Sequence, residues 1–423
     1  MKTSGKTFAE KVLSRAAGQD VKAGEVVVVR PDFCMSHENA SSVYQTFQTI
    51  GLQQVWDSSR IVIIFDHTVP PSTEEYADSQ KKVRQLVAEQ NIKHFYDMNN
   101  FGGICHQIMC QEGYAAPGLV IVGTDSHTCT HGALGAFATG IGRTEMAAIW
   151  ATGQIWLQVP KSLKITVCGS FRAGVSAKDL ILKIIGDMKA DGADYMSVEF
   201  HGQGIEDMSV AERMTLCNMG IEMGAKNAVC KADQKVCEML AGKLKSGNSQ
   251  EIWADDDAIY DRELSYNLDD LEPGVAKPHT VDNYAAVSQV AGVKIDQAFL
   301  GTCTNARIED LRLAAQILKG RKVAVRTIVN PASCQVYRQA MDEGVLQILL
   351  DAGCTIGHPG CGPCIGVYGG VLAEGEVCIS TANRNFCGRM GSRKSMIYLG
   401  SPMTVAYSAL YGEIRDPGAA FED

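Results

Sequence analysis

Short apolar runs alternate with longer segments of helical spacing along the whole chain, and this alternation constrains the fold more than any other feature. The apolar runs cover residues 26–29, 61–65, 119–122, 163–167, 298–300, 323–329 and 377–379. The segments of helical spacing cover residues 75–89, 177–188, 210–219, 308–318 and 334–350. Strands that alternate with helices are typical of α/β proteins, so we predict an α/β fold with largely parallel or mixed sheets.

Length and two changes in composition predict three domains. The chain has 423 residues, about three times the usual ~150 residues of one domain. Lys161 follows Pro160 and begins a new strand, and residues 245–285 are polar and acidic, as in a solvent-exposed loop or hinge. We therefore expect domains at residues 1–160, 161–285 and 286–423.

Charge and composition exclude several classes of protein. With 39 basic and 48 acidic residues the formal charge is −9, which argues against a nucleic-acid scaffold. No apolar run approaches the roughly 18 residues of a membrane span, and residues 1–5 lack the apolar segment of a secretory signal. Fifteen cysteines without such a signal fit a reducing cytosol better than a disulfide framework. We expect a cytoplasmic protein that binds neither nucleic acid nor a membrane.

Polar side chains follow four of the predicted strands at the point where each strand ends. In α/β sheets, ligands bind beyond the carboxyl ends of the strands. One such end is explained equally well by a helix cap, but four together predict a site. In chain order, the polar groups are Asp66 and His67; Asp125, Ser126 and His127; Thr302, Cys303 and Asn305; and Asn383 and Arg384.

Cys361 and Cys364 form the only Cys-x-x-Cys pair, in a loop rich in Gly and Pro. Tetrahedral zinc would need a second pair or a matching histidine. A thioredoxin-type dithiol would belong at a strand–helix junction of a small βαβ unit. An iron–sulfur cluster needs thiolates, and Cys303 at a strand end is a possible third ligand, although a single cysteine there is as readily a buried apolar residue. Three thiolates on four irons would leave one iron open for substrate, which favours chemistry at the metal over electron transfer.

The motifs that contain these residues resemble the aconitase superfamily over essentially the whole chain. They are residues 124–128, 301–305, 359–364 and 380–386, in the order of the family. The length and the missing final domain are most similar to large subunits of 3-isopropylmalate dehydratase. The resemblance implies three α/β/α domains around a central cleft, without the swivelling fourth domain. It also implies one [4Fe–4S] cluster per subunit, and dehydration and rehydration of small hydroxy di- or tricarboxylic acids.

The resemblance assigns a role to each matched residue. Cys303, Cys361 and Cys364 match the cluster ligands, which leaves one iron not held by cysteine. The residues matched to acid–base roles are Asp66, His67, His106, Asp125, His127 and Glu222. The residues matched to substrate binding are Ser126, Asn218, Asn383, Arg384 and Arg389.

Elementary chemistry agrees with these roles. Histidine beside aspartate at two strand ends suits an oriented, protonated imidazole. A guanidinium group binds a carboxylate through two parallel hydrogen bonds, as expected of Arg384 and Arg389. Asn218 and Glu222 are four residues apart, so we expect them on one face of a helix.

Two departures from the family pattern matter. Cys387 stands where the family usually has glutamate. The serine that acts as base in single-chain relatives belongs to the missing fourth domain, and Ser392, which superficially resembles it, follows Arg389 too closely, so we expect Ser392 to be structural. The base should therefore come from a small subunit, in a heterodimer or heterotetramer.

The resemblance implies isomerisation of 2- and 3-isopropylmalate in leucine biosynthesis. Large subunits of homoaconitase and of dimethylmalate or methylmalate dehydratase are alternatives of the same class. The alternatives from other classes are a thiol–disulfide oxidoreductase that uses Cys361 and Cys364, and a non-catalytic, iron-sensing RNA binder. The acidic net charge weighs against the RNA binder.

Overall fold

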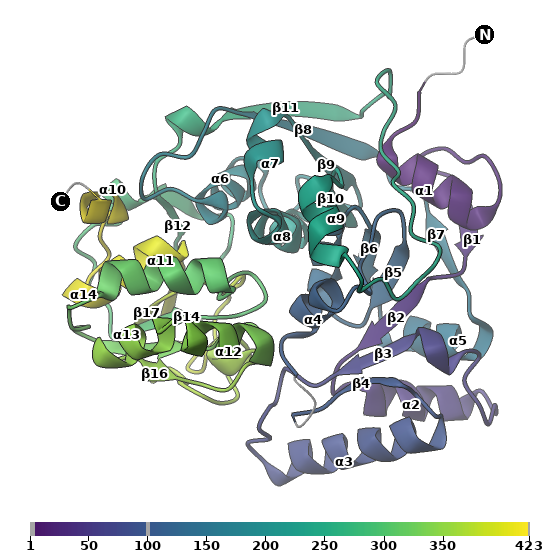
Figure 1. Ribbon diagram of the computed structural model, residues 1–423, viewed down its shortest axis with the longest axis horizontal. Coiled ribbons are helices and arrows are strands. Elements are labelled where there is room, and N and C mark those ends of the chain that lie inside the picture. Colours follow the sequence, from purple (N-terminus) through teal and green to yellow (C-terminus); the bar gives the residue numbers. More distant parts are fainter. Residues whose placement is uncertain (1–4, 99–101, 422–423) are drawn as a thin grey trace.

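The computed structural model describes residues 5–98 and 102–421. Within them a parallel five-stranded sheet, with strand order β4-β3-β2-β5-β6, forms the N-terminal part of the molecule (Figure 1). Its strands are β2 (Phe33–Ser36), β3 (Ile61–Ile64), β4 (His94–Tyr96), β5 (Val120–Gly123) and β6 (Phe137–Gly140). Its helices are α2 (Ala40–Thr49), α3 (Glu74–Glu89), α4 (Cys105–Gln111) and α5 (Arg143–Thr152). The central strands β3 and β5 are buried along their whole length, as expected when helices cover both faces of a parallel sheet.

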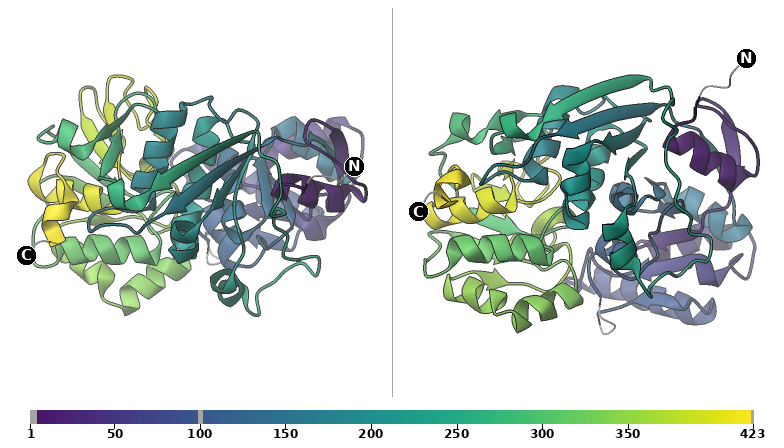
Figure 2. Two further views of the ribbon diagram at one scale, coloured as in Figure 1. Left: turned by 90° about the horizontal axis from the view of Figure 1, so that it is seen from above. Right: turned by 45° about the horizontal axis from the view of Figure 1, so that its top comes forward.

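A second parallel sheet, with strand order β10-β9-β8-β11, connects the N-terminal part to the C-terminal part. Its strands are β8 (Ser162–Cys168), β9 (Ser197–His201), β10 (Asn227–Cys230) and β11 (Arg262–Asn267). Its helices are α6 (Ala177–Met188), α7 (Gln203–Asp207), α8 (Val210–Met219) and α9 (Gln234–Leu240). In the views of Figure 2 the N-terminal and C-terminal parts lie toward opposite ends of the molecule, with these strands between them.

The C-terminal part is built on a mixed seven-stranded sheet with strand order β13-β12-β18-β17-β14-β15-β16. Its strands are β12 (Gly274–Ala276), β13 (Tyr284–Ala286), β14 (Gln297–Leu300), β15 (Arg326–Val329), β16 (Thr355–Ile356), β17 (Val377–Ser380) and β18 (Met396–Leu399). Its helices are α10 (Val287–Val290), α11 (Ile308–Leu318), α12 (Cys334–Asp342), α13 (Val345–Asp351) and α14 (Pro402–Tyr411). Near the N-terminus, α1 (Phe8–Ala17) precedes a two-stranded antiparallel ribbon of β1 (Val26–Val29) and β7 (Ile155–Gln158).

Three details differ from the pattern expected from the sequence. The segment 334–350 is two helices, because Gly344 lies between them in the left-handed region, with φ of 73°. The segment 323–329 becomes a strand only at Arg326. Residues 245–285 are not one loop: they contain β11 and β12, and the expected boundary at 285 falls inside β13.

Strand pairing refines the three-domain division that we propose. β12 pairs with both β13 and β18, so the chain enters the third sheet before Gly274. Residues 274–285 therefore group with the third sheet rather than with the second, because their backbone hydrogen bonds are made there. The strands between residues 162 and 267 all belong to the second sheet, because β10 pairs with β9 and β11 pairs with β8.

A short 3-10 helix, η2 (Ser126–Leu134), joins the first and second sheets. It packs against α8, β6 and β10. Gly132 permits this approach, because a Cβ atom at that position would lie 1.8 Å from the carbonyl oxygen of Ala228. The packing brings the residues that follow β5 into the interior of the molecule. Among the described residues, no helix combines the length and the apolar character needed to cross a membrane.

Candidate active site

The carboxyl ends of β3, β5, β14 and β17 contribute to one small pocket. Its lining includes ten of the fourteen residues singled out from the sequence, which are Asp66, His67, His106, Asp125, His127, Cys303, Cys361, Cys364, Asn383 and Arg389. The pocket is closed across the first and third sheets by a backbone hydrogen bond of 2.9 Å from the N–H of Cys361 to the carbonyl oxygen of Asp66. The four strand ends therefore converge, although they are far apart in the chain.

The loop that carries Cys303 is held in an unusual conformation. Thr302 has φ of 78°, in the left-handed region that β-branched residues rarely adopt. Such a residue costs on the order of 1–3 kcal/mol and persists only where its surroundings impose it. Here the Oγ1 atom of Thr302 accepts a hydrogen bond from the N–H of Thr304, and Arg307 donates to the carbonyl oxygen of Cys303 at 2.9 Å. Strain of this kind is typical of a site at which side-chain direction matters.

The three cysteine sulfurs line one pocket but do not form a compact site for a single metal ion. All three thiols are free. Cys361 directly precedes the short 3-10 helix η5 (Gly362–Ile365), and Cys364 lies within it. Among the described residues, the one group of three or more metal-ligand atoms within 4.8 Å of one another is formed by His37, Glu38, Asp66 and His67, so the three sulfurs do not form such a group. Ligands of a single zinc ion at about 2.3 Å would lie within about 4.6 Å of one another. As the side chains lie, the three sulfurs are not grouped around one zinc ion, and three thiolates that each bind a different iron are what a cluster would require.

The surroundings of the sulfurs also fit a bound metal cluster. Burial raises the pKa of Cys303 to about 12 and that of Cys361 well above its ordinary value. Cys361 and Cys364 are buried and Cys303 is partly buried, and thiolates in such surroundings would be unstable without a compensating positive charge, which iron supplies. Asn383 places its Nδ2 atom 3.1 Å from Sγ of Cys303, and Arg389 places an Nη2 atom 3.7 Å from Sγ of Cys364. Both contacts suit sulfur atoms that carry negative charge.

A chain of alternating carboxylates and imidazoles also lines the pocket. Asp66 bonds Nδ1 of His67 at 2.6 Å, Nε2 of His67 lies 3.5 Å from Asp125, and Asp125 bonds Nε2 of His106 at 2.7 Å. Burial by itself would lower the pKa of His67, but Asp66 and Asp125 outweigh it and raise that pKa well above its ordinary value. Burial would likewise raise the pKa of Asp125, but hydrogen bonds from His106, His127 and His67 hold it well below its ordinary value. At neutral pH, His67 is therefore an imidazolium between two carboxylates.

Glu222 connects this network to the second sheet. Its Oε1 atom accepts from Nε2 of His127 at 2.7 Å and from Nε of Arg384 at 2.8 Å. The spacing predicted that Glu222 shares a helix with Asn218, but it does not. Helix α8 ends at Met219, and Glu222 belongs to the 3-10 turn η3 (Gly220–Met223). The turn moves Glu222 toward His127, which a continued α-helix would not do.

Four of the singled-out residues lie outside the lining of the pocket. Ser126 lines a neighbouring hollow with Thr124 and Tyr195. Asn218 is fully buried and bonds Thr130, Thr304 and Asn383, so it orients the loops behind the sulfurs. The remaining two are Glu222 and Arg384. Glu222 accepts a hydrogen bond from the lining residue His127, and Arg384 donates to Glu222.

Arg389 is the guanidinium group best placed for a ligand. It lines the pocket, and its Nε atom is buried without a hydrogen-bond partner among the described residues. The Oδ1 atom of Asn383 is likewise buried without a hydrogen-bond partner among the described residues. Buried polar groups are ordinarily satisfied, so these two atoms indicate the direction from which a polar ligand binds.

Comparison with known proteins agrees with this arrangement. A model of the aconitase family (aconitate hydratase) matches residues 10–412. The chain belongs to the aconitase family. It is 51% identical over 98% of its length to 3-isopropylmalate dehydratase large subunit 1 of Methanopyrus kandleri, of which it covers 99%. It is also 51% identical, over 91% of its length and 98% of the relative, to the probable methanogen homoaconitase large subunit of Methanosarcina mazei.

The family and these relatives indicate a hydro-lyase, as the motifs imply. The crystal structure of Thermococcus kodakaraensis aconitase X in its holo-form is similar in fold, with a TM-score of 0.52 over 89% of this chain and 88% of that one. Because the two are 11% identical, the likeness concerns the fold alone. It confirms the predicted α/β, aconitase-like architecture.

The position at which this aconitase-family chain departs from its pattern lies away from the pocket. Cys387 is exposed, and its thiol donates to the carbonyl oxygen of Arg393 at 2.9 Å. Ser392 is anchored through its backbone N–H to the carbonyl oxygen of Leu372 at 3.0 Å. Neither residue belongs to the lining described above.

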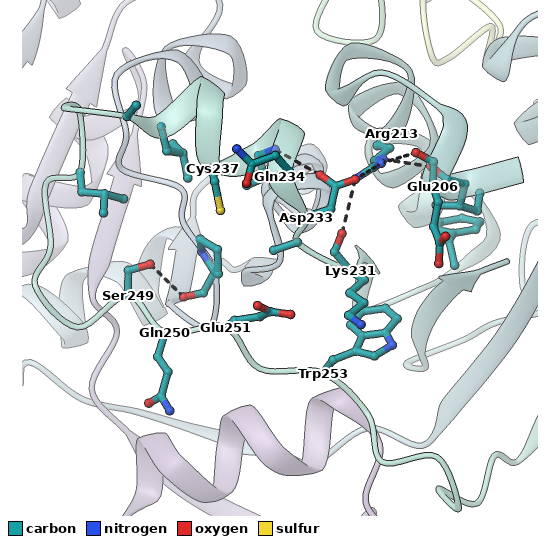
Figure 3. Close-up of a pocket in the computed structure, with 18 of the residues that line it drawn as sticks. Glu206, Arg213, Lys231, Asp233, Gln234, Cys237, Ser249, Gln250, Glu251 and Trp253 are labelled. Carbon is teal, nitrogen blue, oxygen red and sulfur yellow. Dashed lines mark hydrogen bonds and ion pairs between the residues drawn. The ribbon is translucent and has the colours of Figure 1, made fainter. Parts of the chain in front are cut away.

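A larger cavity, of about 770 Å³, lies elsewhere in this aconitase-family fold. Figure 3 shows it between α9, the chain around Ser249 and the carboxyl ends of β9 and β10. Its labelled residues include Lys231, Asp233, Cys237 and Trp253, and none of the residues singled out from the sequence lines it. The size of this cavity is therefore no indication that it is the active site.

Glu38 is a residue of the site that the sequence analysis missed. Its carboxylate accepts hydrogen bonds from the backbone N–H groups of Asp66, His67 and Thr68 at 3.1, 3.3 and 2.8 Å. It thereby fixes the turn that presents His67, whose ring also stacks on His37 with centroids 4.0 Å apart. Glu38 follows strand β2, whose sequence is Phe-Cys-Met-Ser. This short strand lacks a clear apolar run, so the polar residue after it was not recognised as part of the site.

Replacing Glu38 by Gln should lower stability at neutral pH by about 2–3 kcal/mol, because charge-assisted hydrogen bonds contribute about this much. Burial would raise the pKa of Glu38, but the neighbouring imidazoles of His37, whose Nδ1 lies 3.5 Å from the carboxylate, and His67 outweigh it and hold that pKa below its ordinary 4.5. The carboxylate therefore stabilises the fold above about pH 4.5, and this contribution is lost as the pH falls through the lower folded-state pKa. In urea titrations the difference between wild type and Glu38→Gln should shrink on acidification. Equal urea midpoints at pH 7 would contradict the assigned role.

Proposed function

We propose that this chain is the cluster-bearing large subunit of a hydro-lyase that interconverts 2-isopropylmalate and 3-isopropylmalate by loss and re-addition of water. The observation that carries the proposal is the pocket itself. Its lining combines three thiols, the imidazolium of His67 and the guanidinium of Arg389, whose Nε atom has no hydrogen-bond partner among the described residues. The similarity to the large subunit of Methanopyrus kandleri supports the choice of substrate.

Cys303, Cys361 and Cys364 would hold a [4Fe–4S] cluster, with one iron not bound to cysteine. When bound, the cluster supplies a Lewis acid for the hydroxyl group that leaves the substrate. Asn383 and Arg389 hydrogen-bond two of the sulfurs and so orient the ligands.

The side chains of the pocket would bind the substrate and move one of the protons. Arg389 binds a substrate carboxylate with its Nε donor, which the protein leaves unused. His67 holds a proton at neutral pH and donates it to the departing hydroxide, while Asp66 and Asp125 fix its ring. His106 and His127 orient Asp125 and Glu222, and Ser126, Asn218 and Arg384 act through neighbouring residues rather than on the substrate.

The base that removes the carbon-bound proton would come from a second polypeptide. The carboxylates of the described pocket are engaged by imidazoles, and those of Asp66 and Asp125 flank the acid. A small subunit that supplies a serine base completes the site, in a heterodimer or heterotetramer. We place the complex in the cytoplasm and in leucine biosynthesis.

The large subunit of a homoaconitase is the second candidate, because the Methanosarcina mazei relative of that name is as similar, at 51% identity. The two functions differ only in the substrate. Steady-state assays of the chain with its small subunit, on 2-isopropylmalate, homocitrate and short alkylmalates such as dimethylmalate, distinguish them. We expect the highest kcat/KM with 2-isopropylmalate, and a preference for homocitrate would establish the second candidate instead.

Exposure of the active complex to air should remove most of its activity, because the iron that lacks a cysteine ligand is the one most readily lost. Incubation with ferrous iron and a reductant should restore turnover. Iron content and activity measured together before air, after air and after reactivation test this expectation. Full activity after prolonged exposure to air would exclude the Lewis-acid role.

A further inference from the structure

Lys178 is a buried lysine whose hydrogen-bond partners are all neutral. It is the second residue of α6, and its side chain is among the largest that are fully buried. Within the described residues its Nζ atom donates to the carbonyl oxygens of Thr381 at 2.9 Å and Ala382 at 2.7 Å. A buried ammonium group with neutral partners is costly, because burial removes its hydration without a compensating charge.

Among the described residues, Arg213 is buried as fully as Lys178 but has a charged partner. The guanidinium of Arg213 forms an ion pair with the carboxylate of Asp233, besides hydrogen bonds to backbone carbonyls. Lys178 has no such ion pair among the described residues. The two carboxylates that act on Lys178 electrostatically accept hydrogen bonds from other groups: Asp179 from Ser176 and Gly274, and Asp310 from the backbone N–H of Arg307.

The surroundings of Lys178 point to the cysteines as its missing counter-charge. Burial lowers the pKa of Lys178 to about 7, and the groups that oppose this are, in decreasing order, Cys303, Asp310, Asp179 and Cys364. The carbonyls that it binds belong to the two residues after β17 and directly precede Asn383, whose side chain bonds Sγ of Cys303. Lys178 therefore lies behind the turn that faces the sulfurs and does not belong to the lining of the pocket.

We propose that Lys178 is the counter-charge of the iron–sulfur cluster: its ammonium group offsets the negative charge of the cluster and its three thiolates, and it holds the turn that directs Asn383 at Cys303. The inference rests on the proposed cluster. A positive charge in a buried site acts strongly, because the surroundings screen it poorly. Cluster potentials depend on net charge and on hydrogen bonds to the sulfurs, so Lys178 should raise the reduction potential. Lys178 is a positioning residue and does not touch the substrate.

The test compares two substitutions at Lys178 with one matched control, all in the anaerobically purified protein. Lys178→Gln keeps a hydrogen-bond donor and removes the charge, and Lys178→Arg keeps the charge. Lys226→Gln is the control: Lys226 is a partly buried lysine whose Nζ lies 3.5 Å from the carbonyl oxygen of Gly140 and whose pKa is lowered by burial, with no cysteine among its influences. The readouts are iron and sulfide content and the midpoint potential from a mediated redox titration followed by EPR.

Lys178→Gln is expected to shift the reduction equilibrium about tenfold toward the oxidised cluster, which is about 59 mV for a one-electron couple. Lys178→Arg and Lys226→Gln should keep the wild-type potential. An unchanged potential in Lys178→Gln overturns the inference, whereas a wild-type protein without iron and sulfide overturns the proposed function instead. If Lys178→Gln assembles no cluster, a cluster of wild-type potential in Lys178→Arg supports the need for charge. Loss of the cluster from both Lys178 variants, but not from Lys226→Gln, shows that charge does not suffice and overturns the inference.

Discussion

Replacing any one of Cys303, Cys361 and Cys364 by Ser is expected to abolish the visible iron–sulfur absorption of the anaerobically purified protein and to reduce its activity with the small subunit to near zero. Each substitution removes one of three anchors, and the structure offers no fourth thiol in the lining of the pocket to replace it. The measurement is the absorption spectrum with iron and sulfide analysis of each variant. The fold should persist, because serine is close in size to cysteine.

Cys387→Ser is the matched control. Cys387 is exposed and bonds Arg393 rather than the pocket, so its removal should leave the spectrum and the iron content unchanged. Full cluster content in one of the three pocket variants would remove that cysteine from the ligand set. Loss of the cluster in Cys387→Ser would show that the exposed thiol takes part in binding.

The second large effect is the inactivity of the isolated chain. Dehydration needs a base on the face of the substrate opposite the departing hydroxide, within about 2.6–3.2 Å of the proton that it takes. In the described pocket His67 is already a proton donor, and Glu222 is held by His127 and Arg384. The rate of the chain alone should therefore lie near the background rate.

Titration of the small subunit into the cluster-bearing chain should raise turnover to a plateau, and the stoichiometry at the plateau gives the composition of the complex. A small subunit with its candidate base serine replaced by alanine should bind without restoring the rate. Turnover by the isolated chain at the rate of the mixture would place the base on this chain and contradict the assignment of roles.

Local patterns in the sequence predicted the elements that are long or strongly apolar. The helices Ala177–Met188 and Val210–Met219 begin and end at the expected residues, because both are preceded by serine caps and carry a buried face. Short strands of mixed sequence, such as β2 and β4, escaped notice, since three or four residues carry little periodicity. The left-handed Gly344 within the segment 334–350 was missed because helical spacing continues on both sides of it.

The sequence by itself determined which residue types stand at the strand ends. Asp66 and His67, Asp125 and His127, and Cys303 follow apolar strands, and the parallel arrangement of those strands follows from their alternation with helices. The family resemblance could be recognised from the same motifs. Strand ends are encoded locally, since an apolar run and the polar residues after it lie within a few positions of one another.

Only the tertiary structure decided how those residues act on one another. The hydrogen bonds from His127 and Arg384 to Glu222, the turn that Glu38 holds around His67, and the position of Lys178 behind Asn383 each join residues from different elements. The separation of the sulfurs, which are not grouped around one zinc ion, also depends on how two loops of the third sheet are placed. Contacts of this kind follow from the packing of three sheets around one pocket, and no local pattern of residues encodes distances between elements that meet only after the chain has folded.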